Sequence, residues 1–125
     1  MRYMLLIYGR ETEMAAASPD EWERVKAAHN AVIEETRRRG IFEAAEPLQP
    51  TATATTVRSD GGKPLILDGP FAETKEQLAG YYILECRDLD EAIAWATKIP
   101  TSGKGAAACV EIRPFAALPA RSAGR

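Results

Sequence analysis

Residues 18–40 read SPDEWERVKAAHNAVIEETRRRG, and this stretch carries the strongest local signal in the chain. Ser18 at the N-cap, Pro19 at the first helical position and Glu21 three residues after the cap are typical of a helix start. Three arginines and a glycine close the stretch, as expected where a helix ends. The side that would face a core repeats at helical spacing: Trp22, Val25, His29, Val32, Ile33 and Thr36. We therefore predict a helix from Pro19 to Arg39.

Short apolar runs bounded by Gly and Pro surround this helix and predict strands. The expected strands are 2–8, 41–45, 53–58, 63–67, 80–86 and 106–113, with one helical turn at 74–78 and a polar connector at 11–17. A second helix is expected from Asp88 toward Pro100, because Asp88 precedes Glu91 at capping distance. Two β-α-β units joined through an inserted β-hairpin predict an α+β fold, a ferredoxin-like β-α-β-β-α-β protomer with both helices on one face.

Two helices cover only one face of such a sheet, so the second face needs a cover of its own. By strand alternation we expect Met4, Leu6, Tyr8, Tyr82 and Leu84 on that second face. Leaving it wet would expose an apolar patch of several hundred Å². The pattern thus predicts a homodimer in which two sheets pack face to face, with a cavity at or beside the joint.

Size and composition exclude several classes of protein. The chain has 125 residues, which predicts a single domain over 1–115 followed by a flexible C-terminal tail over 116–125. A formal charge of −2 argues against direct nucleic-acid binding. No apolar stretch reaches membrane-spanning length and no signal peptide is evident, so we expect a cytoplasmic protein with no membrane contact.

No sequence motif indicates a metal or a cofactor. Cys86 and Cys109 lack C-x-x-C spacing, and we expect both to be reduced, buried and structural. The acidic residues form no ligand cluster with a histidine, and no G-x-G-x-x-G or Walker loop is present. The expected cofactor set is therefore none.

Three segments resemble the YCII-related family, in its DGPF branch. They are DGPFAETKEQLAGYY at 68–82, MRYMLLIYG at 1–9 and VEIRPF at 110–115. The resemblance implies a dimeric α+β barrel built from a ferredoxin-like protomer. It also implies a link to sigma factors of the extracytoplasmic-function type, beside whose genes many such proteins are encoded. Some members of the wider superfamily are lyases that remove chloride from substituted hydroquinones with a His and an Asp.

His29 is the one histidine of the chain and the first candidate catalytic residue. Its unperturbed pKa of about 6.5 suits a general base at neutral pH. The alternative is a core histidine bonded to a carbonyl group, and the family resemblance favours the catalytic role because the family's active-site His also lies in the first helix. Asp68 is the candidate that orients the imidazole, since Gly69 and Pro70 hold the backbone beside it. The alternative is that Asp68 only accepts from backbone amides two or three residues later, as Asp does in turns.

Tyr8, Phe71 and Tyr82 are the candidate substrate-binding residues, the tyrosines as phenol donors to a substrate oxygen. Buried aromatics mostly pack, and Phe71 is also interpreted as an anchor of its turn in the core. Two hypotheses about function follow. The first is a cofactor-free His/Asp acid-base enzyme of lyase or isomerase type, acting on a small cyclic or aromatic compound. The alternative is a non-enzymatic dimeric accessory protein that binds a small ligand or a sigma factor.

Overall fold

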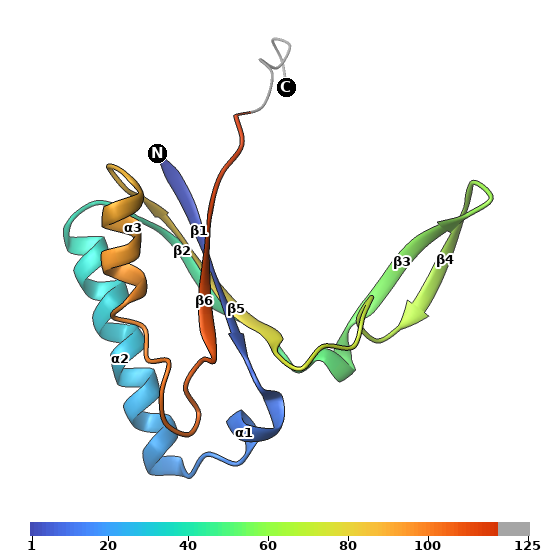
Figure 1. Ribbon diagram of the computed structural model, residues 1–125, viewed down its shortest axis with the longest axis horizontal. Helices are drawn as coiled ribbons and strands as arrows, with labels where there is room; N and C mark the ends of the chain where they lie inside the picture. Colours follow the sequence, from blue (N-terminus) through green and yellow to red (C-terminus); the bar gives the residue numbers. More distant parts are fainter. Residues whose placement is uncertain (118–125) are drawn as a thin grey trace.

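A computed structural model describes residues 1–117, and its elements follow the predicted order (Figure 1). The expected tail lies outside the described residues from 118 onward. The elements are β1 (Arg2–Gly9), α1 (Glu11–Ala15), α2 (Pro19–Arg38), β2 (Phe42–Pro47), the 3-10 turn η1 (Thr51–Thr53), β3 (Thr55–Asp60), β4 (Lys63–Asp68), β5 (Gln77–Glu85), α3 (Leu89–Ala96) and β6 (Cys109–Pro114).

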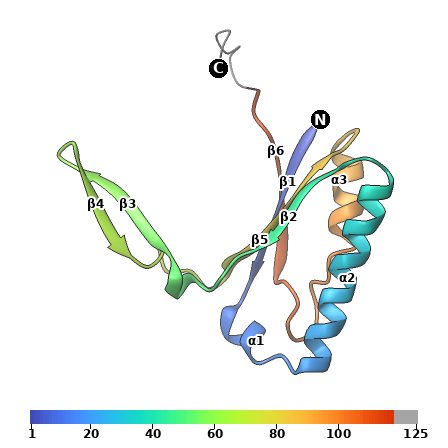
Figure 2. The same cartoon turned by 180° about the vertical axis from the view of Figure 1, so that it is seen from behind.

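Four strands form one antiparallel sheet in the order β2-β5-β1-β6. The central strand β1 pairs Leu5 with Tyr82 on one side and with Ile112 on the other. Each β-α-β unit therefore places its two strands apart with a strand of the other unit between them, which is the ferredoxin-like arrangement. Both α2 and α3 lie on the same face of this sheet (Figures 1 and 2). The predicted α+β fold class is confirmed.

The capping signal that opens α2 forms as predicted. The Ser18 hydroxyl accepts from the Glu21 amide at 3.1 Å, and the Glu21 carboxylate accepts from the Ser18 amide at 2.9 Å. These two bonds satisfy backbone donors that a helix start otherwise leaves unpaired. They fix where α2 begins, and with it the position of His29 along the helix.

The core lies between the helices and the sheet. Its buried members are Tyr3, Leu5, Ile7, Val32, Tyr82, Leu84, Cys86, Ala92, Trp95, Ala96, Ile99 and Ala107. Thr36 is a buried polar side chain, and its hydroxyl donates to the Val32 carbonyl oxygen at 2.8 Å. Burial of these apolar side chains is the main stabilising contribution to the fold.

The assignment of Tyr82 and Leu84 to the second face was wrong. Tyr82 lies opposite Leu5, and Leu84 opposite Tyr3, and directly opposed residues share a face of the sheet. Both are buried under the helices. The face away from the helices, which we call the open face, instead carries Met4, Leu6, Tyr8, Tyr81 and Ile83, all partly exposed in one chain.

Two local predictions also differ from the structure. Residues 74–78 form no helical turn, because Gln77 already pairs with Gly9 as the first residue of β5 and gains its backbone partners there. The connector after β1 contains the short helix α1, whose first amide donates to the Gln77 side-chain oxygen at 3.0 Å. Local capping patterns did not reveal either of these contacts between distant segments.

Two side chains expected in the core are exposed. Cys109 begins the edge strand β6 and lies at the surface, whereas Cys86 is buried as predicted; both are free thiols. Phe71 is 76% exposed and does not anchor its turn in the core. It lies three residues after the end of β4.

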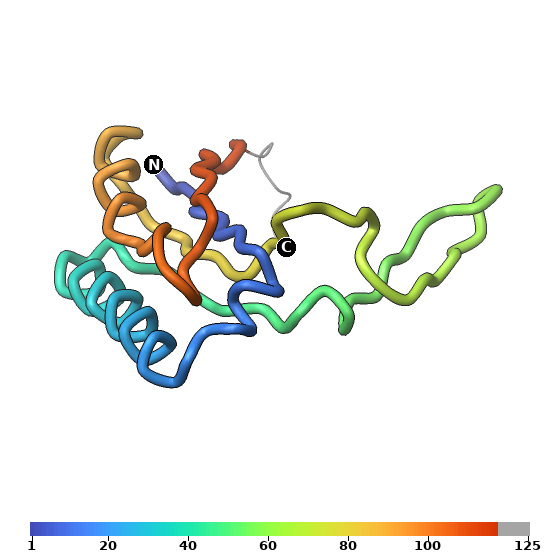
Figure 3. The backbone as a smooth tube through the Cα atoms, turned by 60° about the horizontal axis from the view of Figure 1, so that its bottom comes forward, coloured from blue at the N-terminus to red at the C-terminus, as the bar shows by residue number. Residues whose placement is uncertain are grey.

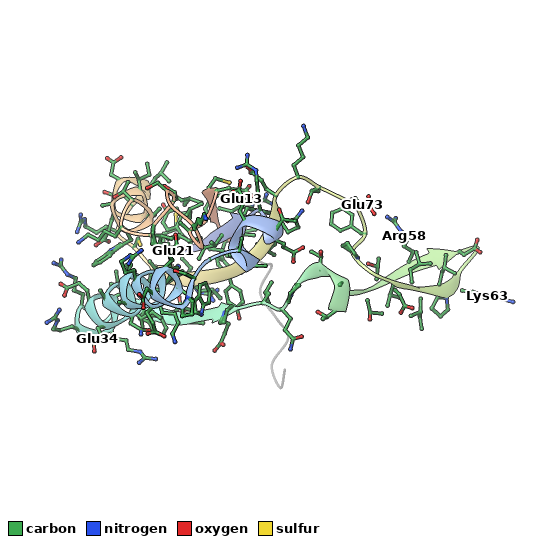
Figure 4. The ribbon with its side chains drawn as sticks, turned by 90° about the horizontal axis from the view of Figure 1, so that it is seen from below. Glu13, Glu21, Glu34, Arg58, Lys63 and Glu73 are labelled. Atoms are coloured by element: carbon green, nitrogen blue, oxygen red, sulfur yellow. The ribbon has the colours of Figure 1, made fainter. Side chains whose placement is uncertain are left out.

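Strands β3 and β4 form a separate hairpin, residues 55–68, which we call the arm. Its turn uses Gly61 and Gly62 with φ of 58° and 86°, a left-handed conformation that glycine adopts without strain. Figures 1, 2 and 3 show that the arm projects from the sheet on the side away from α2 and α3. Arg58 and Lys63 mark it in Figure 4, at the opposite end of the molecule from Glu34 on α2.

Candidate functional site

A pocket of about 240 Å³ lies where the first half of α2 crosses the sheet. Its lining residues are Ile7, Met14, Trp22, Val25, Lys26, His29, Asn30, Ile33, Ala45, Glu46, Pro47, Ala79, Gly80, Tyr81, Tyr82, Gly105 and Ala107. Most of these are apolar, with a few polar groups among them, which is the composition of a small-molecule site. The volume lies just below the usual range for drug-sized ligands, so the pocket fits a single small ring compound.

The helical repeat of α2 places its part of the lining. Trp22, His29 and Ile33 belong to the stripe predicted to face the sheet, and they do line the pocket. Lys26 and Asn30 fall outside that stripe, but they lie one helical turn from Trp22 and Ile33 and border the same pocket. The spacing of Lys26 and Asn30 from Trp22 and Ile33 is the sequence feature that could have placed them at the pocket.

His29 contacts Tyr82, which lies 53 positions later in the chain. The Nδ1 atom of His29 is 2.7 Å from the Tyr82 hydroxyl oxygen, and the two rings stack with centroids 5.9 Å apart. The same hydroxyl can donate to the His29 carbonyl oxygen at 3.4 Å. When Nδ1 carries the proton and donates to Tyr82, the second ring nitrogen, Nε2, keeps its lone pair.

Burial keeps both partners of this pair uncharged. The pKa of His29 lies below its usual 6.5 because the partly buried ring loses solvation of its charged form. The pKa of Tyr82 is raised for the same reason, because burial also removes solvation from the charged phenolate. At neutral pH the site therefore holds a neutral imidazole beside a protonated phenol.

A close approach of two strands shapes one wall of the pocket. Gly80 on β5 pairs with Pro47 on β2, and a Cβ atom added at Gly80 would lie 2.8 Å from the Glu46 carbonyl oxygen. Real Cβ contacts essentially never come so close. The absence of a side chain at Gly80 lets β2 pair here.

Asp68 does not approach His29 within one chain. It is the last residue of β4, on the arm, and Figures 1 and 2 show the arm on the opposite side of the sheet from α2. Its carboxylate has no hydrogen-bond or ion-pair partner among residues 1–117. The contact with His29 that was predicted for Asp68 is made by Tyr82 in this chain.

Tyr8 and Phe71 lie outside the pocket, whereas Tyr82 is one of its lining residues. Tyr8 is on the open face and donates to the Glu111 carboxylate at 3.3 Å, and Glu111 also accepts from Arg113 at 2.6 Å. Partial burial and the nearby Glu111 charge raise the pKa of Tyr8. Tyr8 therefore belongs to a polar cluster on the other side of the sheet.

A second hollow of about 280 Å³ is lined by charged and small residues, among them Arg10, Glu13 and Glu76. Arg10 lies 3.7 Å from Glu13 and 3.4 Å from Glu76, so these charges already pair with one another. Exposed ion pairs of this kind contribute little to stability, and this hollow contains neither His29 nor an apolar wall. We place the candidate site in the His29 pocket.

Within residues 1–117, no group of three His, Cys, Asp or Glu side chains is arranged to hold a metal ion. In the same part of the chain, no helix is long and apolar enough to cross a membrane.

Comparison with known proteins places the chain among relatives. The YCII-related domain matches residues 1–116. An uncharacterised protein of Rhizobium meliloti (strain 1021) is 38% identical over 116 residues, covering 93% of both chains. In structure, the chain is similar to 5-chloro-2-hydroxyhydroquinone dehydrochlorinase (TftG) from Burkholderia phenoliruptrix AC1100, solved in complex with 2,5-dihydroxybenzoquinone. That similarity has a TM-score of 0.52 at 16% identity over 93% of this chain and 94% of the other, and it concerns the fold. The chain belongs to the YCII-related family.

Proposed function

We propose that this protein is a small-molecule enzyme of lyase or isomerase type, in which His29 accepts a proton without help from a cofactor. The observation that carries the proposal is the 2.7 Å contact between His29 Nδ1 and the Tyr82 hydroxyl at the wall of a largely apolar pocket. A general base needs an orienting partner and must be unprotonated at the working pH, and the His29–Tyr82 pair meets both conditions.

The chemistry assigned to the site is proton abstraction next to a carbonyl or from a phenol. Nε2 of the neutral imidazole takes the proton, and the electron pair left behind moves onto the substrate oxygen as an enolate or phenolate. The electrons then return either to expel a leaving group, which is elimination, or to pick up a proton elsewhere, which is isomerisation. Asn30 and Lys26 both line the pocket and are the donors that we assign to the developing oxyanion, with the Lys26 ammonium first leaving the Glu23 carboxylate, to which it donates at 3.1 Å.

The substrate class we propose is a small cyclic or aromatic compound. A volume of about 240 Å³ and apolar walls favour one ring with a few oxygen substituents. The fold neighbour solved with 2,5-dihydroxybenzoquinone supports this class, because its ligand is of that size and type.

An orienting role for Asp68, and substrate contacts for Tyr8 and Phe71, stay predictions. Within one chain Tyr82 occupies the place at Nδ1, so Asp68 could reach a His29 pocket only from the arm of a second copy. Tyr8 and Phe71 would likewise need a site that two copies share.

We also propose that the protein is a homodimer. The open face places the side chains of Met4, Leu6, Tyr81 and Ile83 side by side across two central strands, and in one chain all four stay partly exposed. Monomeric proteins seldom leave a continuous apolar patch of that size uncovered. A second copy, paired face to face, covers it.

In the non-enzymatic alternative, the same pocket binds a small ligand but catalyses no reaction. In that account the dimer binds a small ligand and contacts a sigma factor, and a pull-down from cell extract would recover that factor with His29→Ala as well as with the wild type. The sigma-factor partner and the cytoplasmic location both remain predictions from the sequence and its family.

A thermal-shift screen tests the proposed function. The probes are 2,5-dihydroxybenzoquinone, substituted hydroquinones, simple phenols and lactones, applied to the wild type, His29→Ala and the control Tyr3→Phe, whose hydroxyl lies outside the pocket. Ligand binding raises the melting temperature by mass action. We expect at least one probe to stabilise the wild type and Tyr3→Phe, and to lose its effect in His29→Ala.

Repeating the screen with Cys109→Ser separates binding from reaction of a quinone with the exposed thiol. Absorbance of the stabilising probe, followed over time, then distinguishes an enzyme from a binding protein. Equal stabilisation of the wild type and His29→Ala by every active probe would contradict a role for His29 in ligand binding.

A further inference from the structure

The arm exposes more large apolar side chains than an isolated hairpin sustains in water. Val57 is 65% exposed and Ile66 68%, and Leu65, Leu67 and Phe71 are exposed as well. Two-stranded hairpins are marginally stable unless a further layer packs on them. An uncovered arm of this composition would also be prone to aggregation. The arm therefore requires a surface to pack against.

Apolar side chains occupy both faces of the arm. Val57 pairs with Ile66, and directly opposed residues share a face. Leu65 and Leu67 alternate with Ile66 and so lie on the other face. A hairpin with one apolar face buries it by packing against one protein surface. This arm has two apolar faces, so it can bury both only between two protein surfaces.

The base of the arm is tied to the body, which sets the direction in which the arm points. The Leu48 amide donates to the Ala79 carbonyl oxygen at 2.7 Å, just before the arm begins. Thr51 donates to the Glu11 carboxylate from its amide at 2.7 Å and from its hydroxyl at 2.6 Å. These bonds fix the chain that leads into the arm, and the apolar residues of the arm do not pack on the open face of the same chain.

The arm and the open face point to the same side of the molecule. Figures 1 and 3 show the helices on one side of the sheet and the arm reaching out on the other. A molecule seated on the open face is therefore within reach of the arm. With six residues in each strand, the arm is about 20 Å long, roughly the width of a four-stranded sheet.

We propose that the arm is a dimer clasp: each arm reaches over a second copy of this chain and packs its Val57 and Ile66 side chains on that partner. The proposal rests on the homodimer proposed above and names the part of the chain that stabilises it. A stable dimer buries about 800 Å² on each partner, and the arm and the open face each offer on the order of several hundred Å² of apolar surface. In a two-fold symmetric dimer, the arm and the open face of each copy both contact the other copy, so the exposed apolar surfaces of both copies are covered.

Sedimentation velocity of the full chain over a range of concentrations tests the clasp. The variants are Val57→Asp with Ile66→Asp, and the control is Ile93→Asp, an equally apolar exposed residue on α3, on the helix side of the sheet. We expect a dimer for the wild type and for Ile93→Asp. For the double variant we expect a dimer dissociation constant at least roughly tenfold higher, because two charges would enter an apolar contact.

Hydrogen exchange of the unmodified chain gives a second readout that does not depend on a variant folding. The amides of β3 and β4 should exchange more slowly at concentrations where the chain is dimeric than where it is monomeric. A monomeric wild type would overturn the homodimer and the clasp together. A dimeric wild type whose affinity is unchanged by the double variant, with arm exchange independent of concentration, would overturn the clasp alone.

Discussion

The Nδ1 atom of His29 lies 2.7 Å from the hydroxyl oxygen of Tyr82, and this contact joins α2 to the central part of the sheet. Tyr82 is 2% exposed, so His29 supplies the polar partner that its buried hydroxyl needs. One contact therefore has two roles. It stabilises the packing of helix on sheet, and it orients the imidazole at the pocket.

Removing the Tyr82 hydroxyl should lower the free energy of unfolding. Tyr82→Phe keeps the ring in the core but leaves Nδ1 of His29 without its partner, which costs about 1–2 kcal/mol. Urea denaturation measures the change. Tyr3→Phe is the matched control, because Tyr3 is equally buried and its hydroxyl has only a long contact of 3.6 Å to the Met1 sulfur. Equal losses in the two variants would contradict the account.

Stability should rise with pH through the range just below 6.5. The pKa of His29 is lower in the folded chain than in the unfolded chain, because burial disfavours the charged ring. Between these two pKa values the unfolded state binds more protons, so the free energy of unfolding falls as the pH falls. Above the unfolded pKa the stabilisation is fully present. Urea denaturation as a function of pH should show this slope for the wild type and a shallower one for His29→Gln.

Much of the fold could be predicted because its signals are local. The capping box at Ser18 and the repeat that follows it give α2 to within a residue, and the glycines after Asp60 give the turn of the arm. The faces of β5 were harder to assign. Residues 81–84 are all apolar, so alternation alone does not say which pair turns toward the helices. Pairing with β1 decides it, and pairing is a tertiary property.

The candidate site was predictable in part for the same reason. A lone histidine on the inner stripe of a helix indicated His29, and its lining of a pocket agrees with that indication. Its partner could not be predicted, because the contact with Tyr82 depends on how α2 crosses β5. The sequence indicated Asp68 as the partner, but in one chain Asp68 is the last residue of β4, on the arm that projects away from the helices.

The two thiols should differ sharply in reactivity. Cys86 is buried, and burial raises its pKa to about 11, so almost none of it is thiolate at neutral pH. Cys109 is exposed, although desolvation and the nearby Glu76 raise its pKa too. A thiol reagent at about pH 8 should modify Cys109 in the native protein and Cys86 only after unfolding. Native reactivity that persists in Cys109→Ser would contradict the burial of Cys86.

A methyl group at Gly80 should disturb the pocket wall. Gly80→Ala places a Cβ atom against the Glu46 carbonyl oxygen, and β2 must shift away from β5. Overpacking of this kind costs about 1–3 kcal/mol. Gly40→Ala is the comparison, since its added Cβ meets no atom within 4 Å and only its backbone conformation is strained. We expect Gly80→Ala alone to weaken binding of a pocket probe in the thermal-shift assay.

The central claim is that His29 is the proton acceptor of a ligand pocket, and nuclear magnetic resonance of its ring nitrogens tests it most directly. His29 is the one histidine of the chain, so its signals need no assignment. The account predicts a titration midpoint below 6.5 in the free protein, and a change in the Nε2 signal when a hydroquinone probe that stabilises the protein is added. An imidazole that titrates at or above 6.5 and does not respond to any stabilising probe would contradict it.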